Sequence, residues 1–161
     1  GIVAYKAKDY SKAFDLFLES YDLGSDDAAN SLLYMARRSE IPGNKRVPPI
    51  VDLLSMCQGS KDTLFLMNYA LCLAKGFQFE EDWHEADKLV SCLSRNKAKE
   101  VLIWWNSEVA SLGDVEGDLV IGWLVRHGLC NDPEGNSIEE RFNRARSGGW
   151  NVPQWLYEMK K

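Results

Sequence analysis

The sequence predicts an all-α fold of antiparallel helix pairs, and three observations lead to this expectation. Apolar residues recur every three or four positions along most of the chain, which is the period of an amphipathic helix. Alternating β-branched stretches are few, and no Asn-Gly or Asp-Gly hairpin signal occurs. Glycines follow several of the apolar stretches, and a glycine after the last turn commonly ends a helix. We therefore expect roughly nine helices in about four stacked pairs, as one domain spanning residues 1–161.

The segments with this period follow one another closely. In order they are residues 9–23, 26–38, 48–59, 61–75, 82–94, 97–112, 114–127, 137–147 and a short last segment that begins at Pro153. Proline and glycine mark the boundaries between them. Pro42 and Gly43 cannot continue the second helix, whereas Pro48 suits the first turn of the third. Gly24 and Gly76 end the first and fourth helices.

Several of the expected helices share a spacing of four, one, three and three residues. The sets with this spacing are Gly117, Ile121, Gly122, Val125 and Gly128; Phe65, Tyr69, Ala70, Leu73 and Gly76; and Ala28, Leu32, Leu33, Ala36 and Ser39. A second spacing of four, three and four links Ala13, Phe17, Ser20 and Gly24 to Ile138, Phe142, Ala145 and Gly149. Small residues at these positions let two helix backbones approach, and the large residue one turn away fills the adjoining groove. The spacing therefore predicts repeated helix pairs that stack to form a core.

At these residues the chain resembles the Sel-one-like repeat family, which is related to tetratricopeptide repeats. The best matches are residues 9–39 and 113–157, and the middle, residues 43–112, is divergent. The segment 97–112 looks like an extra helix that breaks the alternation. The resemblance implies a right-handed α/α solenoid with degenerate repeats, and a role as a scaffold or adaptor that binds other proteins.

The reactive side chains predict no active site. No GxSxG, HExxH, P-loop or GxGxxG motif occurs. His84 and His127 are the only histidines, and neither is paired with another histidine, so both are expected to be structural. The cysteines are widely spaced without a CxxC pair, which predicts free thiols buried in helices of a cytoplasmic protein; they are Cys57, Cys72, Cys92 and Cys130. We expect no catalytic residue, cofactor or metal site.

Charged residues gather at the expected helix starts. Glu80, Glu81 and Asp82 precede one helix, and a second group opens another; this group is Asp114, Glu116 and Asp118. Asp82 and Asp114 are natural N-caps, and acids favour the positive end of the helix dipole. A glycosidase-type acid pair or a cation site is the alternative. Glu139 and Glu140 stand on the same expected helix as three arginines, which predicts a solvated, ion-paired helix face; the arginines are Arg141, Arg144 and Arg146.

Tryptophan is the residue type that points most directly to binding. Trp123 falls in the repeat spacing and is expected in the core, and Trp150 and Trp155 are expected to seal the last helix pair. Trp104 and Trp105 are adjacent, so on a helix they point about 100° apart and one of them is expected to be exposed. Exposed tryptophan beside acidic residues suits a protein partner. The predicted partner-binding residues are Trp104, Trp105, Glu108, Asp114, Glu116, Asp118, Glu80 and Glu81.

Composition narrows the class of partner. The formal net charge is −5, whereas a nucleic-acid surface is normally basic. The longest apolar runs are far shorter than the roughly 20 residues of a membrane span. We expect a protein-binding module without catalytic activity, for example a bacterial immunity or inhibitor protein that neutralises a basic toxin such as a nuclease. The alternatives are a scaffold in a signalling or secretion assembly and a carboxylate-dependent hydrolase.

Overall fold

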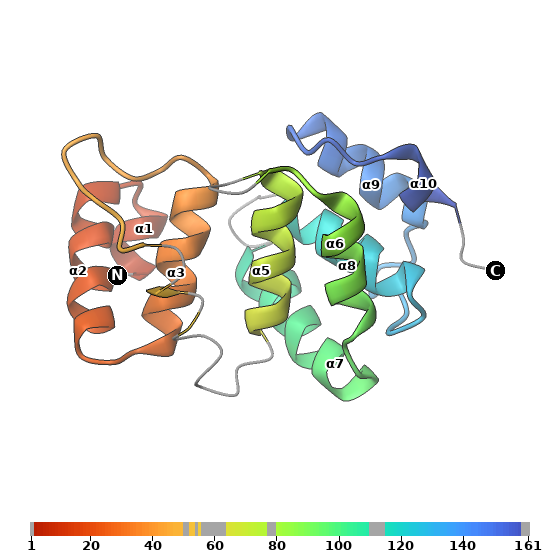
Figure 1. Ribbon diagram of the computed structural model, residues 1–161, viewed down its shortest axis with the longest axis horizontal. Coiled ribbons are helices and arrows are strands. Elements are labelled where there is room, and N and C mark those ends of the chain that lie inside the picture. The colour runs from red at the N-terminus through yellow and green to blue at the C-terminus, as the bar shows by residue number, and fades with distance from the viewer. Residues whose placement is uncertain are drawn as a thin grey trace. The chain divides into compact units, whose positions relative to one another are not determined.

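The described part of the chain is helical throughout its regular elements. The computed structural model describes residues 2–49, 52–53, 55, 64–76, 80–109 and 115–158, and within these ranges every element is a helix (Figure 1). The all-α prediction is therefore confirmed. None of the helices in these ranges has both the length and the apolar character needed to cross a membrane. The chain divides into two compact units, Gly1–Cys72 and Leu73–Lys161.

Unit 1 contains a helix pair that follows the predicted boundaries. Its helices are α1 (Ile2–Lys6), α2 (Tyr10–Asp22), α3 (Asp26–Arg37) and the first part of α5 (Leu64–Lys75). The Asp9 carboxylate caps α2 by accepting a hydrogen bond from the Lys12 amide, and Ser25 caps α3 in the same way. Between them Gly24 has φ +93°, a conformation that favours glycine. This tight turn packs α2 against α3.

The core of unit 1 combines apolar packing with a buried polar contact. Phe14, Leu32 and Leu33 are buried between the helices. Arg37 of α3 donates from Nη1 to the Asn68 side chain of α5 at 3.0 Å, and both side chains are buried. The Tyr5 hydroxyl of α1 donates to Glu40 at 2.7 Å, just after α3. Helix α1 has no counterpart among the predicted segments.

Unit 2 contains the remaining helices. They are α6 (Trp83–Ser91), α7 (Arg95–Ile103), the π-helix η1 (Trp104–Val109), α8 (Glu116–Arg126), α9 (Ile138–Ser147) and α10 (Gln154–Tyr157). The segment predicted as one helix over 97–112 begins two residues earlier, because Ser94 caps α7. It also changes from α- to π-helix at Trp104. The predicted helix over 48–59 lies mostly outside the described residues.

Helices α8 and α9 pack closely at Gly122. A β-carbon at this position would lie 2.9 Å from Phe142 Cε1 and 3.1 Å from Arg141 Cβ, so only glycine fits without a shift. Phe142 is fully buried against this site. The close helix approach expected from a small residue at Gly122 is therefore present. It brings the first turns of α8 and α9 close enough for their charged side chains to meet.

Candidate protein-binding surface

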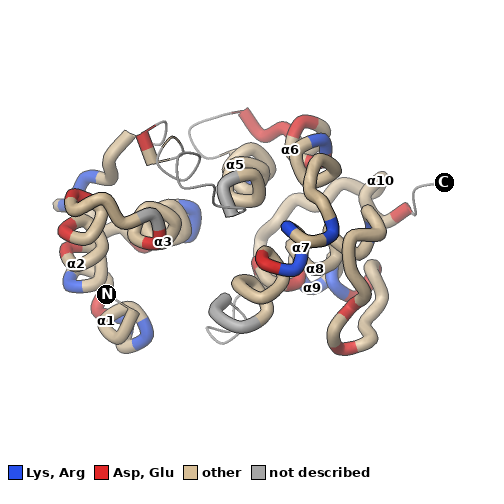
Figure 2. The backbone as a smooth tube through the Cα atoms, turned by 90° about the horizontal axis from the view of Figure 1, so that it is seen from below, with Lys and Arg blue, Asp and Glu red and all other residues tan. Residues whose placement is uncertain are grey.

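The acidic residues before α6 lie on the surface. Glu80, Glu81 and Asp82 are exposed, and Figure 2 shows this acidic run leading into α6. Asp82 is the predicted N-cap, and its carboxylate accepts a hydrogen bond from the Glu85 amide at 3.0 Å. Glu81 accepts one from Trp83 Nε1 at 2.8 Å. These contacts hold the segment in place and leave its carboxylates accessible to solvent.

The adjacent tryptophans of η1 have different environments. Trp105 is only 1% exposed, and its indole Nε1 donates to Glu116 of α8 at 3.0 Å. Glu116 is also only 1% exposed. Trp104 is partly exposed and follows Ile103, which is 64% exposed. Two predicted partner-binding residues, Trp105 and Glu116, therefore lie in the interior, because they bind each other and join η1 to α8.

The second group of predicted acids does not form a surface site. Asp114 and the side chain of Glu108 lie outside the described residues. The N-cap position of α8 is Val115 rather than Asp114, and it makes no side-chain capping bond. Asp118 accepts hydrogen bonds from Arg141 at 2.9 Å and Arg144 at 3.3 Å. The carboxylates of this group that are described are bound within unit 2.

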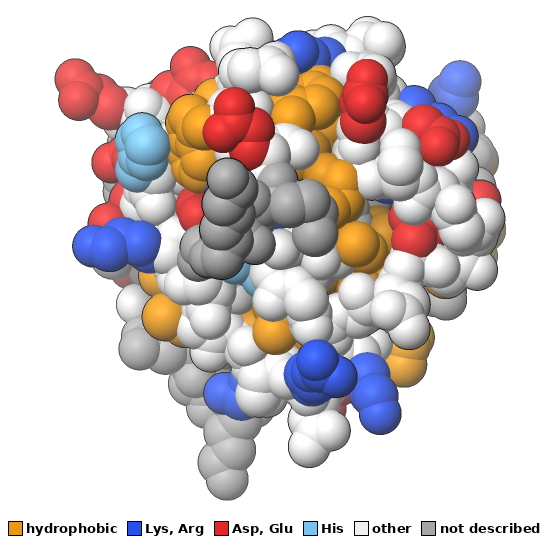
Figure 3. Space-filling view, turned by 90° about the vertical axis from the view of Figure 1, so that its right-hand side faces the viewer, with side chains coloured by type: hydrophobic (Ala, Val, Ile, Leu, Met, Phe, Trp, Pro, Cys, Tyr) orange, Lys and Arg blue, Asp and Glu red, His pale blue; other side chains and the backbone are white. Residues whose placement is uncertain are grey.

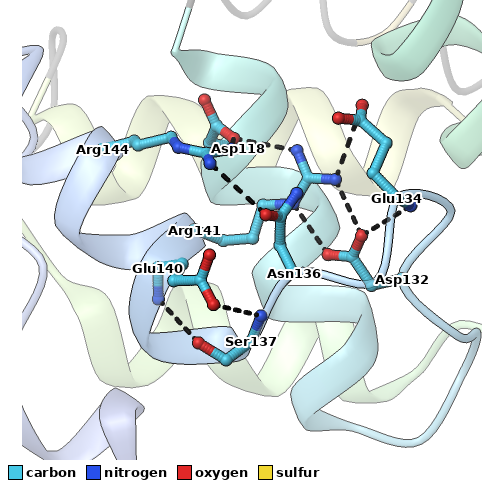
Figure 4. Close-up of polar contacts among 8 residues, drawn as sticks. All are labelled: Asp118, Asp132, Glu134, Asn136, Ser137, Glu140, Arg141 and Arg144. Carbon is cyan, nitrogen blue, oxygen red and sulfur yellow. Dashed lines mark hydrogen bonds and ion pairs between the residues drawn. The ribbon is translucent and has the colours of Figure 1, made fainter.

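Arg141 is the centre of a charged network rather than part of a solvated face. Its side chain is 5% exposed and donates to Asp132 at 2.7 and 2.9 Å, in addition to Asp118 (Figure 4). Arg144 also reaches Asn136 at 3.3 Å. Glu140, which was expected to pair with these arginines, instead forms a capping box with Ser137. The network fixes the segment between α8 and α9, because its acids come from that segment and from α8.

The network shifts the pKa of its members. Hydrogen bonds from Arg141 hold the pKa of Asp132 below its usual range, although burial opposes this shift. The same contact raises the pKa of Arg141. The ionised pair is therefore the stable state at neutral pH.

A second polar cluster joins α6 to α8 and was not predicted. Asp87 Oδ1 accepts hydrogen bonds from Trp123 Nε1 at 2.8 Å and from Arg126 Nη1 at 3.3 Å, and it lies 2.7 Å from His127 Nε2. Burial raises the pKa of Asp87, but the hydrogen bonds from His127 and Trp123 outweigh it and lower the pKa overall. Because an ionised carboxylate only accepts, Nε2 of His127 carries a proton. The half-buried Asp87 carboxylate thus contacts two side chains of α8 and the histidine that follows its last residue.

Tryptophan rings pack beside this cluster. The Trp83 ring lies 5.6 Å from the Trp123 ring and 6.5 Å from the Trp150 ring, measured between centroids. The Lys75 ammonium lies over the Trp150 ring at 4.7 Å. Trp123 and Trp150 are buried, as the sequence predicts. The rings pack α6, α8 and the segment before α10 against one another.

Helices α6 and α10 also carry a half-exposed aromatic stack. The His84 ring lies parallel to the Trp155 ring, with 4.5 Å between centroids, and the Arg126 guanidinium lies 5.6 Å from the Trp155 centroid. His84 is exposed and Trp155 is partly exposed. Figure 3 shows hydrophobic side chains gathered on a face of unit 2, with acidic and basic side chains around them. His84 is thus on the helix surface, as expected, whereas His127 is held by Asp87.

Sequence signals for this stack were weak. The α6 and α10 helices are separated by more than sixty residues in the chain, so no local pattern pairs His84 with Trp155. The sequence pattern around Asp87 predicts only a surface carboxylate of an amphipathic helix. We define the stack surface as His84 and Trp155 with the exposed acids Glu80, Glu81 and Glu85, which lie within four residues of His84 in the chain.

The cysteine prediction is correct in part. Cys72, Cys92 and Cys130 are free thiols, and Cys57 lies outside the described residues. Cys72 is buried in α5, but Cys92 is exposed after the last turn of α6 and Cys130 is half-buried in a loop. The latter two thiols therefore lie outside the core.

Neither a search for metal-ligand groups nor a comparison with known proteins points to a further site. Within the described ranges, no three or more His, Cys, Asp or Glu side chains are grouped so that they could hold a metal ion. Comparison of the chain with protein-family models, curated proteins and solved structures gave no match.

Proposed function

We infer that this chain is a protein-binding module without catalytic activity, and that the stack surface binds a basic protein. The observation that carries the proposal is a half-exposed Trp155–His84 stack whose histidine belongs to the same chain segment as the exposed carboxylates of Glu80, Glu81 and Glu85. Tryptophan is a common centre of protein interfaces, and carboxylates around it attract lysine and arginine. The helix pairs α2–α3 and α8–α9 support the further proposal of a stacked-pair solenoid.

The contacts around Trp155 suit the stack surface for tight binding. Asp87 fixes Arg126, and Arg126 in turn lies against the Trp155 ring. A side chain that is already held in one orientation loses little entropy when a partner binds. The stack surface is therefore pre-organised, which favours a partner bound with little rearrangement.

The partner class distinguishes the two binding hypotheses. An immunity or inhibitor protein needs to cover a basic toxin, for example a nuclease, and its binding depends strongly on charge. A scaffold in a signalling or secretion assembly binds through apolar contacts that salt affects less. The exposed carboxylates of the stack surface favour the first.

A hydrolase that uses Glu116 and Asp118 is disfavoured by their contacts. Glu116 is enclosed beside Trp105, and Asp118 is held by Arg141 and Arg144. A general acid or base has to reach its substrate within hydrogen-bond distance. We therefore rank this hypothesis below the binding hypotheses.

The test is a binding titration with the product of the gene adjacent to the one that encodes this chain. We expect a basic protein bound with a dissociation constant of about 10 nM or lower, since natural inhibitors bind this tightly. Glu80→Lys combined with Glu85→Lys should weaken binding at least tenfold, and His84→Ala should weaken it less. Glu139→Lys, a single charge reversal at an exposed position of α9, is the control for a reversal outside the stack surface and should leave affinity unchanged.

The outcomes separate the hypotheses. Equal affinity for the double variant and the control would rule out the stack surface. Binding that persists at roughly 0.5 M salt would favour the scaffold, because surface charges are largely screened there. Absence of a basic partner would overturn the inhibitor proposal.

A further inference from the structure

Two helix faces outside the stack surface carry exposed apolar side chains. The charges beside these side chains are acidic on one face and basic on the other. Among the described residues, the exposed large apolar side chains are Ile2, Val3, Leu16, Leu23 and Ile103. Ile2 and Val3 belong to the short α1. The other three lie on or at the end of α2 and α7. Besides α1, the α2 and α7 faces are therefore the places in the described part of the chain where a partner would bury exposed large apolar side chains.

The two faces have the same spacing and opposite charge. On α2, the exposed residues Asp15 and Glu19 are followed at the next four-residue step by Leu23, which is 84% exposed. On α7, the exposed residues Arg95 and Lys99 are followed at the same step by Ile103. Residues four apart line one side of a helix. Each helix thus presents two charges and then one apolar residue in a single row.

Neighbouring charges leave this complementarity in place. Lys45 pairs with Asp15 at 3.0 Å, but the Asp15 side chain stays 55% exposed, and such surface pairs exchange easily. Asp22, also exposed, adds a further acid beside the α2 row. Beside the α7 row, the exposed Lys97 and Glu100 carry one positive and one negative charge. The α2 face is acidic and the α7 face is basic.

We propose that copies of this chain associate through these faces, with α2 of one copy lying parallel to α7 of another. In this register Asp15 faces Arg95, and Glu19 faces Lys99. Leu23 then covers Ile103, the apolar pair that ends both rows. Because the two faces differ, the contact is head-to-tail and can extend to further copies.

The contact is small, so the association is weak. Helix α7 has nine residues, and a single pair of helices of this length covers less than the ~1,200 Å² of a stable interface. A dissociation constant of about 0.1–1 mM is the expected range. Sedimentation velocity at rising concentration in about 20 mM salt should show a rising sedimentation coefficient, and roughly 0.5 M salt should abolish the rise.

Charge-reversal variants test the faces and the register. Glu19→Lys and Lys99→Glu should each remain monomeric, because like charges then meet in the register. An equal mixture of the two should associate again, and so should the double variant Glu19→Lys/Lys99→Glu. Glu139→Lys is the matched control and should behave as the parent chain. Circular dichroism confirms that each variant is folded.

The proposal fails if the parent chain is monomeric at about 1 mM and low salt. It also fails if the single variants associate as the parent does, or if mixing them restores nothing. The α2 and α7 faces share no residue with the stack surface. Failure here therefore leaves the proposed binding of a basic protein standing, and the reverse is equally true.

Discussion

Replacing Arg141 by methionine tests whether its charged network holds unit 2 together. Arg141→Met keeps a long side chain of similar helix propensity but removes the guanidinium. Three hydrogen bonds of 2.7–2.9 Å to Asp132 and Asp118 are lost. The Asp132 side chain is 6% exposed, so its carboxylate is left nearly buried without its cationic partner, although the Glu134 amide still donates to it at 2.9 Å.

The cost follows from these environments. Removing one partner of a buried ion pair costs about 3–5 kcal/mol, because a charge is left unpaired in the interior. Asp118 is more accessible and keeps its contact with Arg144, which reduces the penalty at that end. We therefore expect a loss of about 3 kcal/mol in the free energy of unfolding at pH 7.

The effect should depend on pH in one direction. Hydrogen bonds from Arg141 lower the pKa of Asp132 in the folded state. A carboxyl whose folded pKa is depressed adds stability that is present above its unfolded pKa, near 4, and is lost as the pH falls through the folded value. The difference between parent and Arg141→Met should therefore be full at neutral pH and shrink below about pH 4.

Urea unfolding followed by tryptophan fluorescence measures this difference. Arg144→Met is the matched control, because Arg144 lies one turn along the same helix and its side chain is 48% exposed. Its loss should be at most about 1 kcal/mol. If the two variants were equally stable, or if the deficit of Arg141→Met grew on acidification, the reasoning would be refuted.

Three further predictions concern packing, ionisation and reactivity. Gly122→Val should lower the free energy of unfolding by about 1–3 kcal/mol in urea titrations, because it overpacks the buried contact with Phe142. Burial and the nearby Glu40 carboxylate raise the pKa of Tyr5. The raised pKa of Tyr5 adds stability that is present below about pH 10 and is lost as the pH rises through the folded pKa. Unfolding measured at alkaline pH tests this loss. Alkylation mapped by mass spectrometry should modify the exposed Cys92 before the buried Cys72.

Controls for these three are available in the same chain. Gly43→Ala should change stability little, because a β-carbon there meets nothing within 4 Å. Tyr5→Phe should remove the part of the alkaline loss of stability that we assign to Tyr5. It should also lower the free energy of unfolding by about 1 kcal/mol, because its hydrogen bond is lost. Equal stability of Gly122→Val and the parent chain would contradict the close approach of α8 and α9. Equal alkylation rates at Cys72 and Cys92 would contradict the burial of α5.

Local interactions explain why helix positions were predictable. Asp9, Ser25, Asp82, Ser94 and Ser137 cap the helices that follow them, and each cap bond spans three residues. Four of these caps lie at predicted helix starts or immediately before them, namely Asp9, Ser25, Asp82 and Ser137. Ser94 is the exception, because the sequence predicts that it ends the preceding helix. The change to a π-helix at Trp104 was not predicted, because it belongs to the segment that packs on α8.

The environments of individual side chains depended on distant partners. The local sequence does not distinguish Trp104 from the adjacent Trp105. Only Trp105 lies where its indole donates a hydrogen bond to Glu116. Arg141 was expected to pair with glutamates on its own helix but binds Asp132 and Asp118 instead. Packing at Gly122 brings α8 and α9 close, and this places those acids within reach.

The sequence by itself determined the helical class, most helix boundaries and the small residue that lets α8 approach α9, because these follow from interactions within a few residues. Only the tertiary structure decided which charges are buried and which aromatic rings reach the surface. Asp87 is a half-buried acceptor and His84 is a partner of Trp155 because of contacts between α6, α8 and α10. A side chain's environment is set by residues far along the chain, so the stack surface appears only once the helices are packed.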